Sequence, residues 1–304
     1  MKKVIEISHL EKSFGDIKAV QDLSFIVKEG ELFAFLGVNG AGKSTTISIL
    51  CGHLQKDKGE IKINEKDLET HLSDVKKDLG VVFQYSGLDQ ALNVYENLYT
   101  RALLYGMSKE QFLHRLEALS DLLDLKPLLK RTLKKLSGGQ KRRVDIARAI
   151  IHEPKILILD EPTTGLDPQT RKTIWDVIEK LRKEQKMTVL LTTHYMEEAS
   201  DADYVVIIDS GRISAEGTPL ELKNTYTGDF ITLYNVNEED VKKLQLPYQK
   251  IKDAYRLEVK NTAQATELIR KNPKLFFDYE ITKGKMDDVF LAVTGKNLIR
   301  GEEK

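Results

Sequence analysis

The sequence predicts an α/β fold built around a mostly parallel sheet. Four short runs are continuously apolar rather than alternating, which is typical of strands that a parallel sheet buries on both faces. These runs are residues 32–36, 81–83, 156–159 and 189–191. Amphipathic stretches such as residues 170–182 have helical spacing and can form the crossovers that parallel strands require.

Polar residues follow these runs closely. Gly37 follows the first run, Gln84 the second, Asp160 and Glu161 the third, and His194 lies just beyond the fourth. Ligands of open parallel sheets bind beyond the carboxyl ends of the strands. We therefore expect these residues to surround one site.

A helical insertion interrupts this pattern. Between about residues 89 and 132 the β-branched runs disappear, and leucine, alanine and charged residues recur at helical spacing. This predicts a helical subdomain that extends to about residue 150 when the next helix is included. Residues 211–217 complete a last pair of strands, and Thr218 with Pro219 predicts the capped start of a short helix.

The pattern of predicted strands and helices changes near Asp229. Residues 224–228 are typical of a linker. Strand-like segments at 230–234, 255–259 and 275–281 then alternate with helical segments near Val241, at 263–270 and at 286–293. The sequence thus predicts a large domain over residues 1–224 and a small α+β domain over residues 229–304.

Composition excludes several classes of protein. Lys and Arg total 47, as do Asp and Glu, so the formal net charge is zero and the basic excess typical of nucleic-acid binding is absent. We therefore expect no nucleic-acid partner. Apolar runs stay far below the roughly 20 residues that cross a bilayer, so we expect no membrane span. The single cysteine, Cys51, is expected to be a small buried residue of a protein in a reducing compartment.

The strongest chemical motif begins directly after the first predicted strand. Residues 37–44 read Gly-Val-Asn-Gly-Ala-Gly-Lys-Ser, the pattern of a phosphate-binding loop that opens a helix. In such a loop, backbone N–H groups converge on the β-phosphate, and Lys43 reaches the β- and γ-phosphates. The Ser44 hydroxyl ligates Mg²⁺, and Thr45 can hold another phosphate oxygen.

Two carboxylates end the third apolar run. Taken alone, Asp160 and Glu161 could form an ordinary solvated strand end. Beside a phosphate loop, Asp160 can reach the Mg²⁺ shell, and Glu161 can polarise a water molecule for in-line attack on the γ-phosphate. We therefore assign Asp160 to the metal and Glu161 to the water.

A glycine pair opens the helix that begins near residue 140. Residues 136–140 read Leu-Ser-Gly-Gly-Gln, in which Ser137 and Gln140 have the spacing of a capping box. Gly138 and Gly139 each cost about 1 kcal/mol of helix stability. That cost is understandable if bare backbone N–H groups must approach an anion; a capped helix without a ligand is the alternative.

Together and in this order, the three motifs resemble those of ATP-binding-cassette (ABC) ATPases, over residues 2 to about 224. The resemblance implies a P-loop NTPase core with an antiparallel N-terminal β part, ATP and Mg²⁺ as cofactors, and a site shared between two cassettes. From one cassette, ATP would be contacted by Phe14, Gly37, Asn39, Gly40, Ala41, Gly42, Lys43, Ser44 and Thr45. From the other cassette, the contacts would come from Ser137, Gly138, Gly139, Gln140 and Asp167.

The resemblance also implies roles for isolated residues. Phe14 takes the place of the aromatic residue that stacks on adenine, with core packing as the alternative, and Asp167 resembles the loop aspartate that lines the opposite site, although it also fits a helix N-cap. Val38 replaces the usual proline, which leaves the backbone contacts to phosphate unaffected. The implied catalytic residues are Glu161, His194, Gln84 and Lys43, and the implied Mg²⁺ ligands are Ser44, Gln84 and Asp160.

Residues 139–143 and 286–295 are similar to the daunorubicin-resistance type of exporter ATPase. This similarity implies the ATP-hydrolysing subunit of a multidrug or antibiotic-resistance exporter, cytoplasmic and peripheral on the inner face of the cell membrane. A separate polytopic transmembrane permease would be its partner. With one phosphate loop and one Leu-Ser-Gly-Gly-Gln motif per chain, we expect an ATP-dependent homodimer or a heterodimer with a related ATPase. An ABC importer ATPase and a soluble ABC ATPase acting on ribosomes or DNA are the alternatives.

Overall fold

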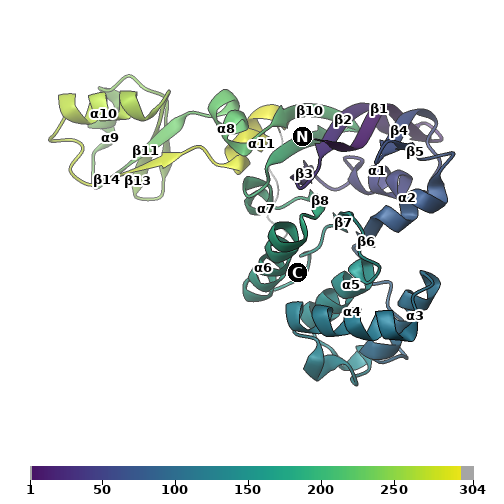
Figure 1. Ribbon diagram of the computed structural model, residues 1–304. Coiled ribbons are helices and arrows are strands. Elements are labelled where there is room, and N and C mark those ends of the chain that lie inside the picture. Colours follow the sequence, from purple (N-terminus) through teal and green to yellow (C-terminus); the bar gives the residue numbers. More distant parts are fainter. Residues whose placement is uncertain (1, 296–304) are drawn as a thin grey trace. The chain divides into compact units, whose positions relative to one another are not determined.

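The structure, a computed structural model, describes residues 2–295 (Figure 1). The chain divides into two compact units between Ser214 and Ala215, inside strand β10 (Arg212–Gly217). The sequence places the boundary later, at residues 224–229. The difference arises because helix α8 (Pro219–Tyr226) packs against α11 (Met286–Thr294) and so belongs to the second unit.

A six-stranded sheet with the order β10-β9-β3-β8-β7-β6 forms the centre of the first unit (Figure 1). Besides β10, its strands are β3 (Leu32–Leu36), β6 (Leu79–Val82), β7 (Ile156–Asp160), β8 (Thr188–Thr193) and β9 (Tyr204–Asp209). The pairs β6–β7, β7–β8, β8–β3 and β3–β9 are parallel. The four predicted apolar runs are therefore adjacent parallel strands, which confirms the predicted fold class.

The register of these strands gathers the predicted site residues at one edge of the sheet. Leu36, the last residue of β3, pairs with Thr193, and Asp160, the last residue of β7, pairs with Thr192. The segments that follow β3, β7 and β8 therefore leave the sheet side by side. This is the edge at which parallel sheets bind ligands.

An antiparallel sheet with the order β2-β1-β4-β5 forms the predicted N-terminal β part. Its strands are β1 (Lys3–Phe14), β2 (Ile17–Lys28), β4 (Lys58–Ile63) and β5 (Lys66–Asp67). Helix α1 (Lys43–Leu50) buries Ile47 and Ile49 in a hydrophobic core to which both sheets contribute. In this core the ring of Phe25 on β2 stacks on that of Phe33 on β3, with centroids 5.2 Å apart.

The predicted helical insertion consists mainly of α3 (Val94–Leu104), α4 (Lys109–Leu122) and α5 (Gly138–Ile150) (Figure 1). Each of these helices begins with a capping box, formed by Asn93, Ser108 and Ser137 with the residue three positions later. The buried ring of Phe112 on α4 contacts two tyrosine rings of α3. Helix α2 (Leu72–Asp78) precedes β6, whereas α6 (Pro168–Gln185) and α7 (Met196–Ser200) flank β8 in the sequence.

The second unit contains a four-stranded antiparallel sheet with the order β12-β13-β11-β14. Its elements are β11 (Asp229–Tyr234), α9 (Glu238–Lys242), β12 (Tyr248–Ile251), β13 (Ala254–Val259), α10 (Thr262–Lys271) and β14 (Tyr279–Lys283). This βαββαβ succession is a ferredoxin-like arrangement. The prediction missed β12, an edge strand whose residues 249–251 are all exposed. It also began β14 too early, because residues 273–275 form a turn and Phe276 is buried beside it without being part of a strand.

Candidate nucleotide-binding site

The phosphate loop joins β3 to α1 and packs closely against β9 and β2. A Cβ atom on Gly37 would lie 2.6 Å from the carbonyl oxygen of Ile208, and one on Gly42 would lie 2.5 Å from that of Ala19. Gly42 also has a φ of 108°, which side-chain-bearing residues rarely adopt. Glycine is therefore needed at both positions for the loop to pack as it does.

Lys43 extends beneath this loop. Its Nζ donates hydrogen bonds to the carbonyl oxygens of Gly37 at 2.7 Å and Val38 at 3.1 Å, and lies 3.5 Å from Oε1 of Glu161. Burial lowers the pKa of Lys43, while the Glu161 carboxylate acts in the opposite direction. A buried ammonium group under a turn of backbone N–H groups favours an anionic ligand.

Asp160 lies next to the first turn of α1. Its Oδ1 accepts a hydrogen bond from Oγ1 of Thr192 at 2.5 Å and another from Oγ of Ser44 at 3.4 Å. Burial raises the pKa of Asp160 above its usual value, and the Thr192 hydrogen bond partly offsets this. The hydroxyl of Ser44 and the carboxylate of Asp160, with the nearby amide of Gln84, are oxygen donors of the kind that Mg²⁺ prefers.

Glu161 is the centre of a cluster of polar side chains. Its Oε2 accepts hydrogen bonds from Nε2 of Gln84 at 3.3 Å and Oγ1 of Thr164 at 3.2 Å, and lies 3.4 Å from Nδ1 of His194. The contact with the imidazole of His194, followed by the charge of Lys43, outweighs burial and lowers the pKa of Glu161 to about 2. The side chain is therefore a carboxylate at neutral pH.

A cavity of about 270 Å³ brings most of the predicted residues together. It is lined by Ala19, Asn39, Gly40, Gly42, Lys43, Ser44, Thr45, Gln84 and Glu161. Asp160 and His194 adjoin it through their contacts with Ser44 and Glu161. The buried residues Gly37 and Ala41 belong to the same loop without lining the cavity.

Phe14 does not line this cavity. It ends β1 with 49% of its surface exposed, and Nζ of Lys12 lies 5.6 Å from the centroid of its ring. This exposure disfavours the alternative that Phe14 is a core residue. A role in stacking on adenine remains a prediction.

The residues assigned to the opposite copy also lie outside the cavity. Ser137 caps α5, with its Oγ accepting from the N–H of Gln140 at 3.3 Å, and Asp167 caps α6, with its Oδ1 accepting from the N–H of Thr170 at 3.0 Å. Both predicted caps are therefore present. Gly138 is exposed at the start of α5, where a ligand can reach it.

Arg142 is a residue of the site that the sequence analysis did not identify. It is 7% exposed, and its guanidinium donates to the carbonyl oxygens of Phe83 and Pro162 at 2.6 Å, Glu161 at 3.1 Å and Asp160 at 3.3 Å. It thus joins α5 to the segments that carry Gln84 and Glu161. The available signal was a charged residue, Arg142, among the mostly apolar residues that α5 buries.

Glu198 on α7 was also missed. Its carboxylate accepts hydrogen bonds from the hydroxyl groups of Thr163 and Thr193, and from Nε1 of Trp175 at 3.4 Å. The residue is 5% exposed, and burial raises its pKa. Glu198 thus connects the segment after Glu161 to the end of β8. Nothing in the sequence indicates this role, because a glutamate in a short helix is usually an exposed residue.

The loop, the buried ammonium group and the paired carboxylates define a P-loop nucleotide-binding site. No helix among residues 2–295 combines the length and apolar character that a membrane crossing needs.

Comparisons with known proteins agree with this class. The family model described as ABC transporter matches residues 20–164. Nod factor export ATP-binding protein I of Rhizobium sp. (strain N33) is 34% identical, with the alignment covering 98% of this chain and 99% of that protein. The methionine import ATP-binding protein MetN of Clostridium tetani is 33% identical, over 99% of this chain and 94% of that protein.

Solved structures agree as well. A bacterial ABC transporter cassette solved as a dimer is 28% identical, with a TM-score of 0.64 over 70% of this chain and 98% of that chain. The protein cbiO1 of Clostridium perfringens, part of an ABC transporter complex, is 29% identical, with a TM-score of 0.68 over 73% of this chain and 91% of that chain.

This chain therefore belongs to the ABC transporter family. It is an ATP-binding subunit of that family, and its reaction is the hydrolysis of ATP.

Proposed function

We propose that this chain powers an ABC exporter of the multidrug or antibiotic-resistance type, from the cytoplasmic face of the cell membrane. The observation that carries this proposal is the nearly full-length similarity to relatives named for Nod factor export, which includes the second unit. A methionine import relative matches an equally large share of the chain. An importer ATPase is therefore the second candidate.

The cluster around Glu161 supports a specific division of labour. We assign Glu161 as the base that polarises the attacking water, because its lowered pKa keeps it ionised and Gln84 and His194 hold its Oε2. Lys43 would neutralise the phosphates. Ser44, Asp160 and Gln84 would hold Mg²⁺, which supplies charge neutralisation at the phosphates when bound.

We further propose that ATP is enclosed between two copies of the cassette. The phosphate loop of one copy would face Ser137, Gly138, Gly139, Gln140 and Asp167 of the other. Two features support this arrangement: those residues do not line the loop's own cavity, and a cassette with 28% identity was solved as a dimer. In a two-fold assembly both sites would form together.

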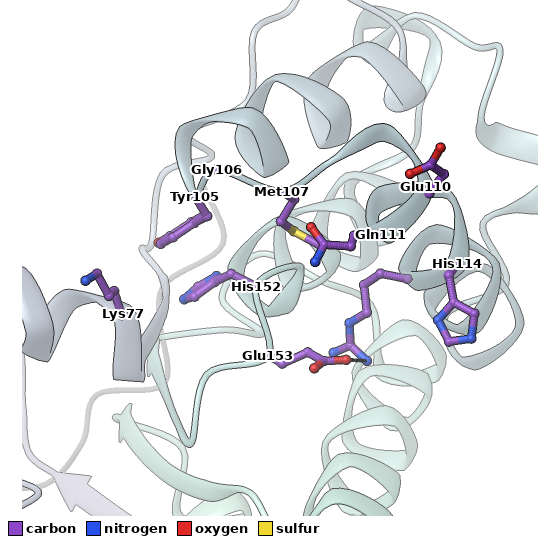
Figure 2. A pocket seen from close by; sticks show the side chains of 10 residues that line it. Lys77, Tyr105, Gly106, Met107, Glu110, Gln111, His114, His152 and Glu153 are labelled. Carbon is purple, nitrogen blue, oxygen red and sulfur yellow. Dashed lines mark ion pairs between the residues drawn. The ribbon is translucent and has the colours of Figure 1, made fainter.

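A cavity of about 690 Å³ in the first unit is a candidate docking site for the membrane partner. Figure 2 shows Tyr105 and His152 facing each other at one side of it, with Met107 and Gln111 beside them. Leu104, the last residue of α3, is 74% exposed. An exposed leucine next in sequence to a cavity that has both polar and apolar lining residues favours a partner segment that is apolar on one face and polar on the other.

The proposal is tested by expressing the chain with a candidate permease and preparing inverted membrane vesicles. An exporter accumulates substrate inside these vesicles when ATP is added outside, and Lys43→Ala abolishes the accumulation. Release of preloaded substrate under the same conditions would instead identify an importer. ATP turnover that no membrane partner changes would contradict a role in transport.

A further inference from the structure

The second unit contains a hollow of about 240 Å³ that has no part in the nucleotide site. Three lysines line it, and they come from three different segments: Lys223 from α8, Lys260 from the turn before α10, and Lys283 from the end of β14. Asn224, Asn261 and Thr227 supply further polar groups to the lining. Segments distant in sequence thus bring ammonium and amide groups to one place.

The charges in this hollow are not balanced. Asp229 is the single acidic residue of its lining, and its Oδ2 lies 3.5 Å from Nζ of Lys283. Within residues 2–295, neither Lys223 nor Lys260 has a carboxylate oxygen within 4.0 Å of its Nζ. Three ammonium groups against one carboxylate leave a formal surplus of two positive charges.

The base of the hollow is tightly packed. Asp229 is 7% exposed, and its Oδ2 also accepts a hydrogen bond from Oγ1 of Thr262 at 2.6 Å. A Cβ atom on Gly284 would lie 1.8 Å from Oγ1 of Thr227, so the end of β14 touches the segment that leaves α8. The backbone segments that carry the three lysines are therefore held in fixed positions by close packing.

We propose that this hollow binds a phosphate group, carried either by a small soluble phosphate compound or by the headgroup of an anionic lipid. Lysine acts as a point charge toward phosphate and needs no fixed approach angle, which suits side chains that come from separate segments. The amides of Asn224 and Asn261 can donate hydrogen bonds to phosphate oxygens. Asp229 would stay paired with Lys283 and Thr262, which leaves Lys223 and Lys260 to the ligand.

The first arm of the test measures binding of inorganic phosphate to the full chain by calorimetry. The chain carries Lys43→Ala, so that the phosphate loop contributes little to the signal. Adding Lys223→Gln and Lys260→Gln should weaken binding by about fivefold for each lysine removed. Lys242→Gln with Lys243→Gln is the matched control, since it removes the same charge from the C-terminal end of α9, where Glu238 and Asp240 pair with these lysines.

The second arm measures sedimentation of the same proteins with phosphatidylcholine vesicles, with and without phosphatidylglycerol. Binding of free phosphate that depends on Lys223 and Lys260 supports a soluble ligand. Binding only to phosphatidylglycerol vesicles, with the same dependence, supports a lipid headgroup. Absence of binding in both arms, or equal weakening by the control pair, would overturn the proposal.

Two further measurements test whether the lysine variant is folded and whether charge determines binding. ATP hydrolysis by the Lys223→Gln, Lys260→Gln chain with Lys43 intact should equal that of the unchanged chain, because neither lysine lines the nucleotide cavity. Asp229→Asn removes the single negative charge of the lining and should strengthen phosphate binding. Weaker binding by a folded Asp229→Asn protein would contradict the electrostatic account.

Discussion

Glu161 has a backbone conformation that few residues with a side chain adopt. Its φ is 46°, in the left-handed region, and such conformations persist when the surrounding structure holds them in place. Its N–H donates to both the carbonyl oxygen and Oγ1 of Thr192, each at 3.1 Å, while its carbonyl oxygen accepts from Arg142. The orientation of the Glu161 side chain, the proposed base, therefore depends on the hydrogen bonds that its backbone makes with Thr192 and Arg142.

We expect Arg142→Met to reduce kcat for ATP hydrolysis by about 100-fold, the order of loss when a reacting group is misplaced by about an ångström. The affinity for ATP should change little, because Arg142 does not line the nucleotide cavity. Arg142→Lys should not restore the rate, since one ammonium group cannot reach all four carbonyl oxygens.

The control for this experiment is Arg143→Met on the same helix. Arg143 contacts the carbonyl oxygen of Leu123 and the exposed side chain of Asp124, away from Glu161. Steady-state kinetics of the three variants test the assignment. A normal kcat in a folded Arg142→Met protein would show that Arg142 does not position Glu161.

Cys51 should be unreactive in the native protein. It is 4% exposed, and burial raises the pKa of its thiol to about 12, so almost no thiolate is present at pH 8. A maleimide should label the protein only after denaturation, as mass spectrometry can verify. Rapid labelling of the native chain would mean that α1 opens far more often than its packing suggests.

At the scale of elements, the start of α5 is fixed by its contact with α6. A Cβ atom on Gly139 would lie 2.3 Å from Cγ2 of Thr170, whereas one on Gly138 would lie 3.3 Å from Leu166. Thr170 cannot easily rotate away, because its Oγ1 donates to Asp167 at 2.5 Å. The sequence analysis explained both glycines by access for an anion, but the structure adds close helix packing as a reason for Gly139.

We therefore expect Gly139→Ala to destabilise the protein by about 1–3 kcal/mol, the usual cost of overpacking. Gly138→Ala should be close to neutral in stability. Thr170→Ser, which removes Cγ2 and keeps the hydroxyl, should rescue Gly139→Ala. Urea denaturation of the single and double variants measures these differences, and equal stability of the two alanine variants would refute the packing argument.

At the scale of the whole molecule, the sequence predicted elements with a strong local signal. The buried strands appear as continuous apolar runs, and the phosphate loop and helix caps depend on residues close together in sequence. Arg142 and Glu198 were missed because their partners come from segments that only tertiary packing brings near. Edge strand β12 was missed because an exposed strand needs no apolar pattern.

The second unit illustrates the same limit. Local patterns predicted three of its strands in approximate position, yet the hollow with Lys223, Lys260 and Lys283 arises only when α8, the start of α10 and the end of β14 meet. Lysines at separate positions look like ordinary surface residues in a sequence. A site formed by residues that are far apart in the sequence can therefore be recognised only in the three-dimensional structure.

Cross-linking between two copies tests the central claim most directly. One tagged chain carries Asn39→Cys in the phosphate loop, a differently tagged chain carries Gly138→Cys, and both carry Glu161→Gln to prevent hydrolysis; the buried Cys51 can stay in place. With ATP, a short bis-maleimide should join the two differently tagged chains, and without nucleotide it should not. ATP-bound protein that never forms this mixed product would contradict a site shared between the phosphate loop and the Ser137–Gln140 segment of its partner.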